Sequence, residues 1–305
     1  MSDSKHIDII GVPSDLGANM RGSNMGPAAL RIAGLKKKIE DQGYSVRDIG
    51  DIMVPIRDAL PKQIQDNKFL EPLVDICNDL SEATYDSLKS GNQPLVVGGD
   101  HSIAIGTISG ISKFYKEKGE DIGVVWVDAH ADINTPTSSP SGNIHGMPLA
   151  TLMGDGHKSL CNVGGSGIKV KPENVALIGI RTIDEDEKRV LKASGVNYYS
   201  MRDVDERGMA KVMTDAIEKI SQNTASIHVS FDIDGIDPRH APGVSTPVSG
   251  GLTFREAHLL LEMVYETNKL GSLEFVELNP YTDVGAQSAH LTVDLILSAL
   301  GKSIV

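Results

Sequence analysis

The chain has 305 residues, of which 40% are hydrophobic and 23% are charged, a balance typical of globular proteins. Its formal net charge of −12 argues against nucleic acid or an anionic membrane as the main partner. The N-terminal sequence MSDSKHIDIIGV has no apolar signal core, no apolar run is long enough to span a bilayer, and Cys77 and Cys161 form no CxxC pair. We therefore expect a cytoplasmic protein.

Short apolar segments alternate with segments of helical periodicity along the chain. The predicted strands are residues 6–12, 44–50, 94–99, 122–127, 174–180, 196–200, 226–231 and 272–278. The predicted helices are residues 70–90, 103–118, 184–194, 204–222, 253–268 and 286–300. This alternation predicts an α/β fold with a parallel sheet that is covered on both faces. With no linker and no internal repeat, we predict one domain over residues 1–305, and a closed eight-stranded barrel is the alternative architecture.

Polar motifs follow several of the predicted strands. They are GGDHS (98–102), DAHAD (128–132), RTIDEDE (181–187), FDIDGIDP (231–238) and VELNP (276–280). Functional residues of parallel α/β sheets lie at the carboxyl ends of the strands. We therefore expect these motifs to meet at one edge of the sheet, although they are far apart in the sequence.

The acids and histidines of three motifs have the composition of a metal site. Alternate residues of extended backbone point to one side, so the ionisable residues of DAHAD share a side, as do the first two aspartates of FDIDGIDP. Carboxylates packed together without cations would repel one another, whereas two divalent cations would balance them. Oxygen-rich ligation with some nitrogen favours manganese, with zinc and copper as competitors. The candidate ligands are His101, Asp128, His130, Asp132, Asp232 and Asp234.

Each candidate ligand also has a simpler interpretation. An aspartate after a strand can cap a helix or a loop, and a histidine can be a buried packing residue; for any one residue this is the better interpretation. Six such residues at alternate spacing after three predicted strands favour the metal site. Other motifs are incomplete, since GGSG (164–167) opens no helix after a strand and ALGKS (299–303) lacks the first glycine of a phosphate-binding loop.

The motifs closely resemble those of the arginase family of ureohydrolases. The resemblance rests on GGDHS, DAHADINTP…SGNIHG, SFDIDGIDP…APGVSTPVSGGLT and EFVELNP, and residues 11–31 are similar to the first loop of that family. It implies a three-layer αβα sandwich with an eight-stranded parallel sheet and a binuclear site that holds two Mn²⁺ ions. It also implies hydrolysis of L-arginine to L-ornithine and urea by a metal-bridging hydroxide, in a homotrimer or homohexamer.

The resemblance further implies how the ligands are shared between the two ions. One ion would be held by His101, Asp128, Asp132 and Asp232. The other would be held by His130, Asp128, Asp232 and Asp234. Asp128 and Asp232 would therefore bridge the two manganese ions.

Three residues would act on the substrate during the reaction. Asp132 would pass a proton to the leaving amine, and His145 would exchange protons with solvent. Glu277, after the last predicted strand, would pair with the guanidinium and orient it for attack. A structural ion pair is the alternative interpretation of Glu277.

The remaining predicted residues would bind the two ends of the amino-acid part of the substrate. Asp184 and Glu187 would bind the α-ammonium, and they also have the spacing of a capping box for the next helix. Thr246 is a further candidate substrate contact. Neutral hydrogen-bonding side chains that suit the α-carboxylate are Asn134, Ser139, Ser141 and Asn143.

Two other enzyme functions and one binding function compete with this interpretation. Another ureohydrolase, such as an agmatinase or a guanidinobutyrase, would not need a loop that binds a carboxylate. A metal-dependent deacetylase with the same fold would have one zinc ion and a different set of ligands. A non-catalytic binding protein would be expected to lack some of the ligands, and this sequence has all six candidates.

Overall fold

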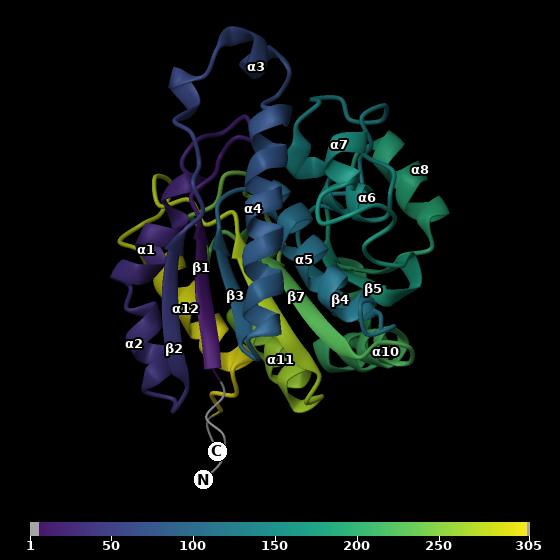
Figure 1. Cartoon of the computed structure of the whole chain (residues 1–305). Helices are drawn as coiled ribbons and strands as arrows, with labels where there is room; N and C mark the ends of the chain where they lie inside the picture. The colour runs from purple at the N-terminus through teal and green to yellow at the C-terminus, as the bar shows by residue number, and fades with distance from the viewer. Residues whose placement is uncertain (1–5, 304–305) are drawn as a thin grey trace.

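The computed structural model describes residues 6–303 (Figure 1). Residues 1–5 and 304–305 lie outside the described residues. The predicted domain includes both segments, and residues 1–5 are also part of the N-terminal sequence in which no signal core was found. In the described part of the chain, parallel strands form an eight-stranded sheet in the order β2-β1-β3-β8-β7-β4-β5-β6. The strands are β1 (His6–Val12), β2 (Ser45–Asp51), β3 (Gln93–Gly98), β4 (Ile122–Val127), β5 (Val175–Ile180), β6 (Asn197–Ser200), β7 (Ser226–Asp232) and β8 (Leu270–Val276).

Helices cover both faces of the sheet, which makes the fold the predicted αβα sandwich. In Figure 1, α4 and α5 lie in front of the sheet, and α11 and α12 lie behind it. The sheet is open, with β2 and β6 at its edges, so the alternative of a closed barrel is wrong. The helices are α1 (Gly26–Ile32), α2 (Leu35–Glu40), α3 (Lys62–Asp66), α4 (Leu70–Lys89), α5 (Ala104–Lys116), α6 (Pro148–Leu152), α7 (Lys158–Cys161), α8 (Glu185–Ser194), α9 (Met201–Arg207), α10 (Met209–Ser221), α11 (Phe254–Glu266) and α12 (Gln287–Ala299).

Burial on both faces explains why β4 is continuously apolar. In β4, Val125 and Val127 pack into the core formed with α10, α11 and α12. Val124 and Trp126 point to the other face and pack into a second core with residues of α5 and α6. Since successive side chains of a strand point to opposite faces, a strand covered on both sides needs an apolar residue at every position.

The helices differ from the prediction in two respects. The predicted helix 204–222 is two helices, α9 and α10, which meet at Gly208 with φ 76° and ψ 149°. Glycine adopts this conformation at little cost, so the chain can turn there. The short helices α1, α2, α3, α6 and α7 have four to seven residues and were not predicted, because they are too short to show helical periodicity.

The order of the strands brings the polar motifs together. The motifs that contain the candidate metal ligands follow β3, β4 and β7, and Glu277 follows β8. These strands are neighbours in the order β3-β8-β7-β4 at the centre of the sheet. Their carboxyl ends therefore meet at one edge, which is where open α/β sheets bind ligands. No helix among residues 6–303 has the length and apolar character needed to cross a membrane.

Gly99 holds the loop after β1 against the end of β3. A Cβ atom at this position would lie 1.8 Å from the carbonyl oxygen of Ser14. The backbone N–H of Gly99 donates to Val12 at 2.9 Å, and that of Asp100 donates to Ser14 at 2.9 Å. The two backbones are therefore too close for any side chain at residue 99.

We expect Gly99→Ala to lower the free energy of unfolding by about 2–3 kcal/mol, because the added methyl group must push the two loops apart. Urea unfolding of the metal-free protein measures this change. Gly146→Ala is a matched control, since a Cβ at residue 146 meets no atom within 4 Å. Equal losses of stability in the two variants would contradict the steric argument.

Candidate active site

The loop after β4 turns two predicted ligands toward His101. β4 ends at Val127, and Asp132 has a left-handed backbone with φ 50°. The expected alternation of an extended strand is therefore not the reason why these residues converge. The loop instead folds back, and a strained backbone at a polar site is a common feature of functional positions.

The first group of candidate ligands surrounds His101. Its Nδ1 atom lies 3.2 Å from Asp128 Oδ2, 3.1 Å from Asp132 Oδ2 and 3.3 Å from Asp232 Oδ2. This buried nitrogen forms no hydrogen bond of acceptable geometry. A nitrogen lone pair that faces three carboxylate oxygens is the donor set expected around a divalent cation.

The second group surrounds His130. Its Nδ1 atom lies 3.3 Å from Asp128 Oδ1 and 3.2 Å from Asp234 Oδ2. The two oxygens of Asp128 therefore each face a different imidazole, as a carboxylate shared by two cations would. Asp232 Oδ1 instead accepts a hydrogen bond from the backbone of Asp234 at 2.7 Å, so bridging by Asp232 stays a prediction.

Hydrogen bonds behind His101 determine which of its nitrogens is free. Ser230 Oγ donates to Glu274 Oε1 at 2.6 Å, so its hydrogen is already engaged. Ser230 must therefore accept the hydrogen bond from His101 Nε2 at 2.8 Å. The proton on Nε2 leaves the Nδ1 lone pair for a metal ion, which is the usual arrangement of a histidine ligand and its supporting partner. His228, also fully buried, lies 3.4 Å from Glu274 and completes this network.

The cluster holds more negative charge than its imidazoles balance. Burial, together with the charges of Asp234 and Asp128, raises the pKa of Asp232 well above its ordinary value. Burial and the charge of Asp128 also raise the pKa of Asp132 to about 6. Burial lowers the pKa of His101, but contacts with three carboxylates outweigh this effect and raise it well above the ordinary value. The cluster thus retains protons that a cation would displace, as metal sites do.

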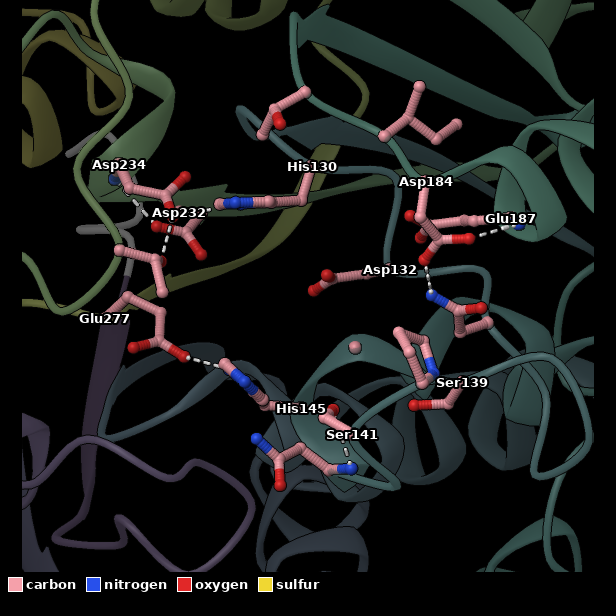
Figure 2. A pocket seen from close by; sticks show the side chains of 17 residues that line it. His130, Asp132, Ser139, Ser141, His145, Asp184, Glu187, Asp232, Asp234 and Glu277 are labelled. Atoms are coloured by element: carbon pink, nitrogen blue, oxygen red, sulfur yellow. Dashed lines mark hydrogen bonds and ion pairs between the residues drawn. The ribbon is translucent and has the colours of Figure 1, made fainter.

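A cavity of about 220 Å³ lies over this cluster. His101 and Asp128 are fully buried outside the cavity lining, whereas His130, Asp132, Asp232 and Asp234 line it. Figure 2 shows Glu277, Asp232 and Asp234 on one side of the cavity, and Asp184, Glu187 and Ser139 on the opposite side. The other predicted residues that line it are Asn134, Ser141, Asn143, His145 and Thr246.

Comparisons with known proteins agree with this geometry. A sequence profile described as "Arginase family" matches residues 5–301. A protein named arginase from Brevibacillus brevis is 45% identical over 302 residues, which cover 99% of this chain and 100% of that protein. The chain belongs to the arginase family. It is therefore a hydrolase of that family, as the resemblance of its motifs predicted.

Solved structures of the arginase family share the whole fold. A structure of arginase from Bacillus caldovelox has 45% sequence identity to this chain and a TM-score of 0.94. The match covers 99% of this chain and 100% of the Bacillus caldovelox chain. The crystal structure of Entamoeba histolytica arginase in complex with L-ornithine is 31% identical, with a TM-score of 0.89, over 98% of this chain and 99% of that chain. The αβα sandwich is therefore the fold of the family.

Glu277 lies between His101 and His145 in this arginase-family site. Its Oε1 accepts hydrogen bonds from the backbone N–H of His101 at 3.0 Å and from His145 Nδ1 at 3.1 Å. Its Oε2 is buried and has no hydrogen-bond partner within the described residues. The backbone of Glu277 has φ 62°, a further strained position at the site. One oxygen of a fixed carboxylate is thus available for a ligand.

Asp184 and Glu187 form only half of the predicted capping box. Asp184 accepts hydrogen bonds from the backbone N–H groups of Asp186 at 3.0 Å and Glu187 at 2.8 Å, so it caps α8. The Glu187 side chain does not reach back to Asp184, and it accepts the N–H of Ile133 at 3.2 Å instead. Burial, together with the charge of Asp132, raises the pKa of Glu187 to about 8. Both acids line the cavity in addition to making these contacts.

The loop 139–143 presents hydrogen-bond donors to the cavity. Ser139 Oγ accepts the N–H of Gly142 at 3.0 Å, and Ser141 Oγ accepts the N–H of Asn143 at 3.2 Å. Each hydroxyl still has its own hydrogen to donate. Asn134 is already engaged, because its Nδ2 donates to Asp184 at 3.1 Å and its Oδ1 accepts from Ser138 at 2.7 Å.

Some contacts at the site were not predicted from the sequence. Thr246 was predicted to bind substrate, and its hydroxyl donates to Asp234 Oδ2 at 2.7 Å. Ser230 and Glu274, which support His101, were not identified at all. An acid in the middle of a buried strand was the available signal for Glu274, because such a residue needs a buried partner.

The contact of His145 with Glu277 predicts an unusual titration. Burial lowers the pKa of His145, but the hydrogen bond and charge of Glu277 outweigh burial and raise it from 6.5 to about 9. A raised pKa in the folded state means that the stabilisation is complete below pH 6.5 and is lost as the pH rises through 9. NMR titration of the metal-free protein should give a midpoint near 9 for His145.

Glu277→Gln should lower this midpoint to about 7 or below, because the favourable charge is removed and burial remains. His157 is an internal control, since burial alone lowers its pKa and its titration should not change. A midpoint for His145 that is the same with and without the Glu277 carboxylate would contradict this assignment.

Proposed function

We propose that the protein hydrolyses L-arginine to L-ornithine and urea, with two Mn²⁺ ions bound at the His101 and His130 clusters. One observation carries the proposal: a single cavity lies over two metal-ligand clusters and is lined by a fixed carboxylate, Glu277, which has an oxygen without a hydrogen-bond partner among residues 6–303. A guanidinium is a permanent cation with a planar fork of donors that matches a carboxylate. Relatives that cover the whole chain at 45% identity are named arginase, which supports this substrate.

The residues fit two divalent cations. His101 Nδ1 would be a ligand of one ion, since its lone pair faces Asp128, Asp132 and Asp232. His130 Nδ1, with Asp128 and Asp234, would hold the other. The donors are carboxylate oxygens and imidazole nitrogens without thiolate, a set that suits manganese. Such a pair of cations supplies a strong nucleophile from water at neutral pH.

Glu277 would orient the guanidinium over the clusters. Its Oε1 is fixed by His101 and His145, so Oε2 has a defined position for one guanidinium N–H. This ion pair would form away from bulk water, where a charge-assisted hydrogen bond is strong. The guanidinium carbon is then held in one position relative to the clusters, which lowers the entropy cost of attack.

Asp132 and His145 would move protons. Asp132 lines the cavity, so its carboxylate can reach the leaving nitrogen, whereas Asp128 is buried outside the lining. His145 also lines the cavity, and 21% of its side chain is exposed, so it can exchange protons between the site and solvent. Its contact with Glu277 keeps the ring beside the reacting group.

The α-ammonium and the α-carboxylate of the substrate would bind to different kinds of side chain. Asp184 and Glu187 are acidic and would bind the α-ammonium. Ser139, Ser141 and the amide of Asn143 are neutral donors and would bind the α-carboxylate. A substrate that lacks this carboxylate would leave these donors unpaired, which is costly at a site shielded from water.

The first test of the proposal is metal content. Dialysed protein reloaded with Mn²⁺ should hold about two ions per chain. His101→Asn should lower this to about one, because it removes a donor from one cluster only, whereas Asp128→Ala should lower the occupancy of both. Elemental analysis after gel filtration measures the content, and His157→Asn is the control. One tightly bound zinc ion with no gain on addition of manganese would contradict a binuclear site.

The second test is substrate preference. The value of kcat/KM should be at least about 10² higher for L-arginine than for agmatine, since only L-arginine has the α-carboxylate. Ser139→Ala with Ser141→Ala should reduce this preference, mainly by slowing L-arginine hydrolysis. Urea release from each substrate is the measurement. Equal or faster hydrolysis of agmatine by the unmodified protein would favour the alternative, an agmatinase, and would leave the metal site unaffected.

A further inference from the structure

The cavity has no lysine or arginine at the end that would bind a carboxylate. Among residues 6–303, its lining contains no lysine or arginine but six carboxylates, those of Asp132, Asp184, Glu187, Asp232, Asp234 and Glu277. The acids outside the metal clusters, Asp184, Glu187 and Glu277, attract a guanidinium and an ammonium group but repel an α-carboxylate. A positive charge close to the loop 139–143 would therefore favour an amino-acid substrate.

Lys68 is a cation in contact with that loop. Its Nζ donates a hydrogen bond to Asn143 Oδ1 at 3.1 Å. Asn143 is only 8% exposed and lines the cavity, whereas Lys68 lines a second hollow, to which Asn143 also contributes. The lysine stem runs beside Gly142, where an added Cβ would lie 3.8 Å from Lys68 Cε.

An unusual backbone holds Lys68 in this place. Lys68 and Phe69 both have left-handed conformations, with φ 54° and 58°, just before α4. Neither residue is glycine, so the turn is strained and needs support from its surroundings. The Phe69 ring is buried at 6% exposure, and the guanidinium of Arg57 lies 4.7 Å from its centre. Arg57 is in turn paired with Asp15 at 3.5 Å.

The lysine also determines which way the Asn143 amide faces. An ammonium group can only donate hydrogen bonds, so the amide oxygen must point toward Lys68. The amide nitrogen, which has no hydrogen-bond partner among residues 6–303, is left for the cavity. Its hydrogens are more positive because the oxygen is bound to a cation. Asn143 then presents a polarised donor pair, which is what a carboxylate accepts.

We propose that Lys68 determines specificity for substrates with an α-carboxylate, by orienting the Asn143 amide and by placing a positive charge behind it. The inference rests on the proposed function, since it concerns the same cavity. Lys68 acts through Asn143 and is therefore a positioning residue. Its effect should appear in KM for L-arginine rather than in kcat, because the charge lies at the far end of the substrate from the reacting carbon.

The experiment compares Lys68→Met, Lys68→Arg and Lys62→Met in the full chain loaded with manganese. Lys68→Met removes the charge and should lower the ratio of kcat/KM for L-arginine to that for agmatine by about tenfold, mostly through a higher KM for L-arginine. Lys68→Arg keeps the charge and should retain most of the preference. Lys62, exposed at the start of α3, is the matched control and should leave the ratio unchanged.

Calorimetry with L-ornithine and putrescine separates this proposal from the proposed function. The two amines differ by the carboxylate, so Lys68→Met should weaken binding of L-ornithine and have a much smaller effect on putrescine. This result would support the role of Lys68 even if the unmodified protein released no urea from L-arginine. A ratio of kcat/KM that does not change, or equal weakening of both amines, would overturn the proposal.

Discussion

The site depends on the mutual repulsion of carboxylates that the fold brings together and buries. Asp128, Asp232 and Asp234 are at most 2% exposed, and the imidazoles that contact them among residues 6–303 are those of His101 and His130. Such a group of charges is unfavourable unless cations or protons balance it. Packing of the strands supplies the free energy that holds the carboxylates in place, since β4 is buried between two apolar cores and β7 and β8 each pack one face into the first of these cores. A bound metal ion would relieve the repulsion between these carboxylates, so the arrangement that opposes folding would also favour metal binding.

A second buried polar layer fixes the ligands from behind. His101, Ser230 and Glu274 form a chain in which every hydrogen bond has one possible direction, because the serine hydroxyl has a single proton. A buried chain of this kind is stable only when all its members are present. It therefore limits His101 to one ring orientation and one tautomer, and a ligand that is already oriented loses little entropy when a metal ion binds.

The sequence predicted the strands well because most of them are buried runs rich in apolar residues with polar residues at their ends, although the edge strands β2 and β6 are partly exposed. It also predicted which acids and histidines meet at the two clusters and the cavity, since most of their motifs follow the central strands. It gave the wrong reason for the convergence of Asp128 and Asp132, which depends on a left-handed residue in the loop rather than on strand alternation. Contacts between distant loops could not be predicted. Lys68 and Asn143 are 75 positions apart, and nothing in the local sequence of either residue indicates the other.

The position of Lys68 behind Asn143 has a physical reason. A lysine inside the cavity would pair directly with a carboxylate such as Asp132 or Glu277, and the pair would occupy the space that a guanidinium needs. It would also compete with metal ions for the negative charge of the clusters. A cation separated from the cavity by one amide avoids both effects, while its field still reaches the far end of a bound amino acid. The acidic net charge of the chain can then attract a cationic substrate, and the neutral loop 139–143 can accept its carboxylate without a fixed charge in the cavity.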